Sequence, residues 1–238
     1  FFYSCKKDIV SFTYVLSGVP AIHISTTNYA AIDSKSIEVD GKINIDSSAF
    51  SGRFEGSIKI RLRGNTTLGF PKLPYKIKLS TKASILGMPA QKNWVLLANY
   101  SDKTLMRNYL AFKGSEIFSL PYTPRSRFVD VFINGVYKGN YQLTEDIRVD
   151  KNRVDINEMA EDHIASDNIT GGYLLEFDQR RDSTDIWVTL NSGLSVIIHQ
   201  PDHNNPTQNN YIKNYLQATE NAIYATNFND TLHGYAKY

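Results

Sequence analysis

An alternation of apolar and polar residues in the first half of the chain predicts β-strands. Between Ile58 and Arg63, and again between Tyr75 and Leu79, every second residue is apolar. In a strand, this period of two places the apolar side chains on one face and the polar side chains on the other. The polar face of these two predicted strands is basic, because it carries Arg61, Arg63, Lys76 and Lys78.

Other apolar runs predict further strands and two helices. The Asn134-Gly135 pair between two β-rich runs favours a tight type I′ hairpin turn. Helical spacing of apolar residues predicts helices at 103–118 and 209–225, and Ser101 or Asp102 suits the first N-cap. Further strands are expected at 19–24, 36–39, 42–46, 94–98, 128–133, 136–145, 173–178 and, as a hairpin, within 186–198. This order predicts an α+β fold with mostly antiparallel sheet and few helices.

The composition is that of a globular protein, and it restricts the possible partners. The 238 residues are 42% hydrophobic and 21% charged, which fits one large domain or two small ones. The formal net charge is only +2, whereas domains that bind nucleic acid usually carry a strong basic excess. We therefore expect no nucleic-acid partner, and local clusters of charge matter more than the total.

The start of the chain has the order of residues found around the acylated cysteine of a bacterial lipoprotein. Apolar residues precede Ser4 and the single cysteine, Cys5, and charged residues follow. On this interpretation residues 1–18 are a tether, the protein is exported to the cell envelope, and a lipid on Cys5 is its membrane contact. No apolar run approaches the roughly 20 residues of a membrane span. The alternative is a disordered terminus with an incidental cysteine.

Two interpretations of the basic face remain open from the residues alone. If the two strands pair, the four cations converge beside a turn of Gly, Asn and Thr at 64–69 and suit phosphate oxygens. A solvated basic face on a two-sided sheet gives the same pattern. The common phosphate-loop and dinucleotide-binding motifs are absent from the chain, so the pattern does not choose between the two.

Two more groups of polar residues are candidates for chemistry. Residues 99–108 bring polar side chains to the entry of the first predicted helix, where they form a site or only cap the helix. Carboxylates stand at strand ends, with Glu145 and Asp146 after one strand and Glu176 and Asp178 within another. Such a carboxylate pair can hold Mg²⁺, and it can equally be a solvated strand exit.

Longer motifs surround these candidates. They are Arg63-Gly64-Asn65-Thr66-Thr67, Phe70–Leu79, Leu86–Pro89, Lys92–Lys103, Met106–Asn108, Pro121–Ser126, Gly139–Glu145 and Gly171–Asp178. In content and order they resemble the signature blocks of the CotH family of atypical kinases, across roughly residues 19–200. Because the blocks are long and specific, chance is a poor explanation of the similarity.

The resemblance implies an atypical kinase-like domain at 19–238 that uses ATP and Mg²⁺ to phosphorylate Ser or Thr in surface or coat proteins. It makes Lys76 the leading candidate for the ATP phosphates, oriented by the helix from Lys103, with residues 143–146 beside the adenine. The ATP-binding residues that it implies are Arg63, Lys76, Lys78, Arg107 and Glu145, and the implied metal ligands are Glu176 and Asp178.

The resemblance also implies a limit. In the family an acidic W-D-x-D block follows this region and carries the catalytic and metal-binding aspartates, and the block does not occur in this sequence. We therefore expect an incomplete C-terminal lobe, no assignable catalytic residue and poor kinase activity from these residues alone. The alternatives are a non-catalytic surface module that binds protein or glycan, and a role in spore-coat or envelope assembly.

Overall fold

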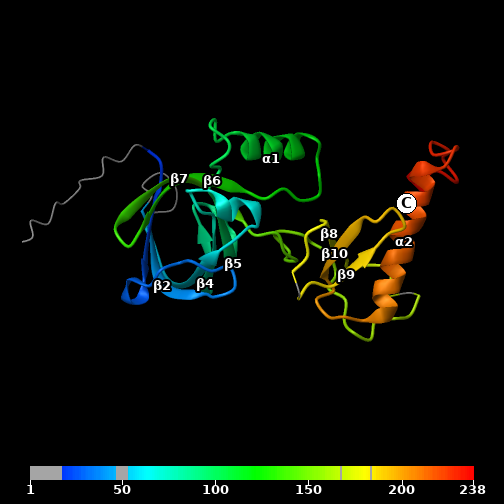
Figure 1. The fold of residues 1–238 in the computed structure, drawn as a ribbon, viewed down its shortest axis with the longest axis horizontal. Helices are drawn as coiled ribbons and strands as arrows, with labels where there is room; N and C mark the ends of the chain where they lie inside the picture. Colours follow the sequence, from blue (N-terminus) through cyan, green and yellow to red (C-terminus); the bar gives the residue numbers. More distant parts are fainter. Residues whose placement is uncertain (1–17, 47–52, 167, 183) are drawn as a thin grey trace, which may run out of the picture. The chain divides into compact units, whose positions relative to one another are not determined.

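The chain folds into two compact units, Phe1–Asp146 (unit 1) and Ile147–Tyr238 (unit 2). The structure is a computed structural model, and it describes residues 18–46, 53–166, 168–182 and 184–238. Most of the β-structure belongs to unit 1, and the longer of the two helices belongs to unit 2 (Figure 1).

Unit 1 is built on seven β-strands that close into a barrel. The strands are β1 (Ala21–Thr26), β2 (Val39–Asp46), β3 (Phe54–Leu62), β4 (Tyr75–Ile85), β5 (Met88–Leu97), β6 (Ser126–Ile133) and β7 (Val136–Glu145). Their order around the barrel is β1-β2-β3-β4-β5-β7-β6. Neighbours are antiparallel except β1 and β6, which pair in parallel and close the barrel with Ile22 opposite Val131.

The apolar residues of the alternating pattern fill the inside of this barrel. Ile60 on β3 lies opposite Ile77 on β4, and neither side chain is more than 1% exposed. Trp94 of β5 is fully buried, and its indole N–H donates to the carbonyl oxygen of Gln91 at 3.0 Å, which satisfies its one polar atom. Because side chains alternate along a strand, the cations between the apolar residues lie on the outer face of the barrel.

The predicted Asn-Gly hairpin is confirmed, and it also helps to close the barrel. Asn134 and Gly135 join β6 to β7 with φ angles of 51° and 78°, the positive values that a type I′ turn requires. The Asn134 side chain accepts the backbone N–H of Thr26 at 2.8 Å and donates to the Thr26 hydroxyl at 2.8 Å. One residue therefore sets the turn and ties the end of β1 to the end of β6.

Helix α1 (Arg107–Ile117) lies between β5 and β6 in the sequence, and none of its residues is buried. The apolar residues that predicted this helix do not form a core face, since Leu110 is 59% exposed. The helix is joined to the barrel by one ring contact, between Tyr109 and Phe128 of β6 with centroids 6.0 Å apart, and by polar contacts. Asn108 donates to the side chain of Asn99 at 2.8 Å, and Asn99 donates to Gln142 of β7 at 3.2 Å.

Unit 2 combines a small sheet with one long helix. The sheet has the strand order β8-β10-β9, and its strands are β8 (Leu174–Phe177), β9 (Trp187–Thr189) and β10 (Ser195–Gln200). Helix α2 (Pro206–Tyr224) begins where Asn205 accepts the backbone N–H of Thr207 at 2.9 Å, and it buries Ile212 in the same core as Val196 and Ile198. Among the described residues there are also short 3-10 helices, of which η1 (Thr27–Tyr29) and η2 (Thr66–Gly69) belong to unit 1 and η3 (Tyr235–Lys237) belongs to unit 2.

The prediction of an α+β, atypical kinase-like fold with an incomplete C-terminal lobe is wrong. Most of the regular structure of the described residues is β-strand, with a closed seven-stranded barrel and two α-helices. The period of two identifies individual strands but does not say which distant strands meet. The parallel pairing of residues 21–24 with 130–133 joins the two ends of the sheet, and this long-range contact makes the barrel.

No helix in the described part of the chain is long and apolar enough to cross a membrane.

Replacing Asn134 by glycine tests how much its side chain stabilises the closed barrel. Asn134→Gly keeps the positive φ available but removes both bonds to Thr26, which is only 6% exposed. A buried donor left without a partner costs about 1–3 kcal/mol, so we expect the free energy of unfolding in urea to fall by about that amount. An unchanged free energy would mean that these bonds do not stabilise the closure.

Candidate functional site

The cations of the predicted phosphate site lie on the outer face of the barrel in two neighbouring rows. The register of β3 and β4 places Arg61 opposite Lys76 and Lys59 opposite Lys78. Like charges directly opposite each other on antiparallel strands are destabilising. The groups around each row therefore decide how much positive charge is left for a ligand.

In the row of Arg61 and Lys76, a carboxylate neutralises Lys76 and backbone carbonyl oxygens accept the hydrogen bonds of Arg61. Lys76 Nζ lies 2.9 Å from Oδ2 of Asp146, and the two side chains are only 24% and 13% exposed. Arg61 donates to the carbonyl oxygens of Lys35 at 2.6 Å and of Leu62 at 3.2 Å. Because partly buried pairs are screened less by salt than exposed ones, Lys76 is held firmly in one position.

The carboxylate beside Lys76 comes from the end of β7 and not from helix α1. The resemblance predicts that the helix after Lys103 orients Lys76, but the contact is made by Asp146. The acidic residue of α1 is Glu116, and it pairs with Lys113 within the same helix at 2.6 Å. The carboxylate that orients Lys76 is therefore that of Asp146, directly after β7.

Glu145, a predicted ATP-binding residue, is fully buried and holds the start of β6 against the end of β7. Its carboxylate accepts the backbone N–H of Arg125 at 3.0 Å, the Arg125 guanidinium at 3.1 Å and the Tyr122 hydroxyl at 3.2 Å. The Glu145 side chain is 0% exposed and that of Arg125 is 44% exposed. These contacts fix the end of β7, and so they also fix the position of the adjacent Asp146.

Arg107, another predicted ATP-binding residue, stands at the first position of α1 with its side chain 82% exposed. Its backbone N–H donates to Asp102 at 2.8 Å, and Asp102 also accepts the hydroxyl of Thr104 at 2.7 Å. These bonds hold the pKa of Asp102 below its usual value, and the bond from the Arg107 N–H has the largest effect. Asp102, one of the two predicted N-caps, therefore binds the start of α1 from the turn before it, whereas the N-cap position is occupied by Met106 because the helix begins at Arg107 and not at Lys103.

The two remaining cations of the predicted set have different surroundings. The Arg63 backbone N–H donates to the carbonyl oxygen of Pro74 at 3.2 Å, which extends the pairing of β3 and β4 to the turn at 64–69. Lys78 is exposed, and it lines a hollow on the outer face of the barrel together with Lys59. Lys78 thus shares the face of Lys76 but belongs to the other row.

The predicted metal ligands Glu176 and Asp178 both lie in unit 2. Glu176 is on β8, and its Oε2 is 2.7 Å from Nε2 of His199 on β10. Asp178 follows the strand and accepts the backbone N–H of Arg180 at 2.9 Å. Within the described ranges, no group of three or more His, Cys, Asp or Glu side chains could hold a metal ion. The assignment of these two carboxylates to Mg²⁺ stays a prediction.

The donor set of unit 1 fits a phosphate group better than a metal ion. Lys76 is a partly buried point charge that Asp146 holds in place, and lysine ammonium groups bind phosphate in this way. Mg²⁺ is usually bound by one or two carboxylates together with phosphate oxygens, so it does not need a complete set of protein ligands. The residues present are therefore compatible with a bound nucleotide.

The motifs and the family comparison agree on what kind of protein this is. The family model described as CotH kinase protein matches residues 60–236, which is most of the chain. The chain therefore belongs to the CotH kinase family, and the resemblance of its motifs is confirmed. No curated protein matches the chain significantly. Family membership supports a CotH-like function in general terms.

Two contacts of the site were not predicted from the sequence. Asp146 stands out in the sequence as an acid at a strand end, but nothing pairs it with Lys76, since β5 separates β4 from β7 in the barrel. No sequence pattern indicates that the guanidinium of Arg125 pairs with Glu145, which is twenty residues away. Both contacts depend on how strands that are distant in the sequence become neighbours.

Replacing Glu145 by glutamine tests the buried contact at the end of β7. Glu145→Gln keeps the shape but removes the charge that accepts three donors, so we expect the free energy of unfolding in urea at pH 7 to fall by about 1–3 kcal/mol. Glu38→Gln, at an exposed position of the same unit, is the matched control and should change little. Equal stability of both variants would contradict this role of Glu145.

The pH dependence of stability tests the cap formed by Asp102. Because its pKa is lowered in the folded chain, the Asp102 charge stabilises the fold above the ordinary value of 3.8. This stabilisation is lost as the pH falls through the lowered pKa. We expect Asp102→Asn to melt at a lower temperature than the unmodified chain at pH 7, and the difference to shrink at about pH 2.5. A difference of the same size at both pH values would contradict the cap.

Proposed function

We propose that this chain is the nucleotide-holding part of a CotH-type phosphotransferase, and that Lys76 contacts the phosphates of ATP. The reaction transfers the terminal phosphoryl group of ATP to the hydroxyl oxygen of a Ser or Thr side chain in a surface or coat protein, with ADP as the leaving group. Family membership supports a CotH-like function, and the Lys76–Asp146 ion pair carries the finer proposal.

The surroundings of Lys76 support this role better than those of the other proposed groups. Its ammonium is partly buried and fixed by Asp146, so little side-chain entropy would be lost on binding a phosphate. Arg107 is 82% exposed, and Lys78 is exposed. Glu145 is enclosed by its own donors, so it acts by fixing the end of β7. Protein kinases likewise need a lysine–carboxylate pair beside the phosphates.

The proposal includes Mg²⁺, which neutralises phosphate oxygens when it is bound with ATP. Glu176 remains a proposed ligand because its carboxylate, which contacts His199 at 2.7 Å, is 53% exposed and so accessible to an ion. Asp178 is retained beside it because both carboxylates lie at the same end of β8. We assign no catalytic residue. Arg63, which directly follows β3, remains a proposed contact to the nucleotide.

The proposed location is the cell envelope, with a lipid on Cys5 as the membrane contact and an exported protein as the phosphate acceptor. Cys5 lies outside the described residues, as does the whole predicted tether at 1–18 except Gly18. The proposal therefore depends on the order of apolar, small, cysteine and charged residues at the start of the chain.

Thermal stabilisation by ATP tests the proposal. A ligand that binds the folded chain raises the melting temperature, and with ATP and Mg²⁺ in 100-fold excess over the dissociation constant the gain is about 2.7 kcal/mol. We expect this shift for the unmodified chain and its loss in Lys76→Ala. Lys138→Ala removes a lysine from an exposed position on β7 and should keep the full shift.

The melting temperatures without ATP separate a folding defect from a binding defect. Lys76→Ala leaves Asp146 without its lysine, so a lower starting temperature is expected, and Lys76→Arg restores a cation at that position. Full ATP stabilisation of Lys76→Ala would contradict the role of Lys76. Absence of any shift in the unmodified chain would contradict nucleotide binding and favour a non-catalytic surface module.

A further inference from the structure

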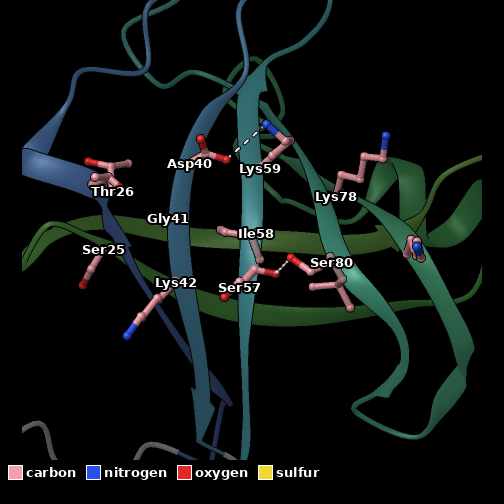
Figure 2. A pocket seen from close by; sticks show the side chains of 13 residues that line it. Ser25, Thr26, Asp40, Gly41, Lys42, Ser57, Ile58, Lys59, Lys78 and Ser80 are labelled. Atoms are coloured by element: carbon pink, nitrogen blue, oxygen red, sulfur yellow. Dashed lines mark hydrogen bonds and ion pairs between the residues drawn. The ribbon is translucent and has the colours of Figure 1, made fainter.

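The outer face of the barrel carries a hollow of about 510 Å³ that the proposed nucleotide contacts do not explain. Residues from five strands, β1 to β5, line it, and we call it the lysine groove after Lys42, Lys59, Lys78 and Lys92. Figure 2 shows the first three of these lysines on three neighbouring strands, with serine hydroxyls between them.

The lysine groove carries more net positive charge than the chain as a whole. Its lining has four lysines and one acidic residue, Asp40, which leaves three net positive charges against +2 for all 238 residues. Asp40 lies 3.1 Å from Lys59, but the two side chains are 70% and 49% exposed, so this surface pair offsets the Lys59 charge only in part. Among the described residues, no carboxylate pairs with Lys42, Lys78 or Lys92.

The strand register shows that this charge is held under repulsion. Lys59 and Lys78 are directly opposite each other, and Lys42 lies diagonally beside Lys59, because Asp40 pairs with Lys59 and Lys42 pairs with Ser57. Cβ atoms at such positions are roughly 5 Å and 7–8 Å apart. The neighbouring row has one carboxylate for its two cations, Arg61 and Lys76, whereas the groove has one carboxylate for four lysines.

The chemistry of the lining restricts the ligand. None of the described residues that line the groove is aromatic, so it offers no surface on which a base or a sugar ring could stack. The strands beneath it are all paired within a closed barrel, so an incoming peptide finds no free strand edge there. Charge and hydroxyl hydrogen bonds are what remains, and both suit the oxygen atoms of phosphate groups.

We propose that the lysine groove is a binding site for a ligand with two or more phosphate groups, separate from the nucleotide contact at Lys76. One phosphate bridges Lys59 and Lys78, and a second reaches Lys42. The ligand relieves the repulsion between the opposite lysines, and the hydroxyl groups of the lining, such as that of Ser25, donate to further phosphate oxygens. The phosphates belong either to a free oligophosphate or to a polyol phosphate chain.

Isothermal titration calorimetry of the full chain with inorganic tripolyphosphate tests this site. We expect Lys42→Gln and Lys78→Gln each to weaken binding about tenfold, because each removes a charged hydrogen-bond donor. Lys138→Gln removes the same charge from an exposed position outside the groove and should bind like the unmodified chain. Raising the salt concentration should weaken binding in all of them.

Two further measurements complete the test. Titration with a glycerol phosphate oligomer shows whether phosphates separated by a polyol unit bind through the same lysines, and this identifies the source of the phosphate. Lys78→Gln should melt no lower than the unmodified chain, because the substitution removes repulsion. Unchanged tripolyphosphate affinity in both Lys42→Gln and Lys78→Gln would overturn the proposal. So would a loss of tripolyphosphate affinity in Lys76→Ala alone, which would assign the binding to the nucleotide contact.

Discussion

The parallel pairing of β1 with β6 is the contact on which unit 1 depends. It joins residues about 110 positions apart and turns a sheet with two free edges into a barrel. Once the barrel is closed, the apolar faces of its strands share one interior, and Ile22, Ile60 and Val131 are part of the core that fills this interior. Asn134 reinforces the closure, because its side chain reaches Thr26 while its backbone makes the hairpin turn.

The closed barrel places the lysines and arginines of β3 and β4 on its outer face, and the contacts there divide these cations into two groups. Lys76 is neutralised by Asp146, which is itself held in place because Arg125 and Tyr122 fix the preceding Glu145. The lysine groove has one carboxylate for four lysines and keeps a net positive charge. Lys76 is a single lysine held in position, whereas the lysine groove is a cluster of incompletely neutralised lysines, so we propose a different ligand for each.

The sequence was a good guide to local structure and to family, and a poor guide to architecture. The Asn-Gly turn, the alternating strands and the position of α2 all follow from interactions between near neighbours. The apolar spacing around Leu110 correctly indicated a helix but wrongly suggested a core face, because helical spacing does not show whether a partner surface exists. The expected kinase-like α+β fold failed for a related reason, since strand pairing over long separations leaves no periodic signal.

What the sequence by itself determined is therefore the identity of the elements, the basic character of one strand face and membership of the CotH kinase family. The tertiary structure alone decided that Lys76 meets Asp146, that Glu145 is buried by its own donors, and that Lys78 joins Lys42 and Lys59 in a separate groove. The physical reason is that a side chain's charge is set by its own residue, but its partner is set by which strands become neighbours when the barrel closes.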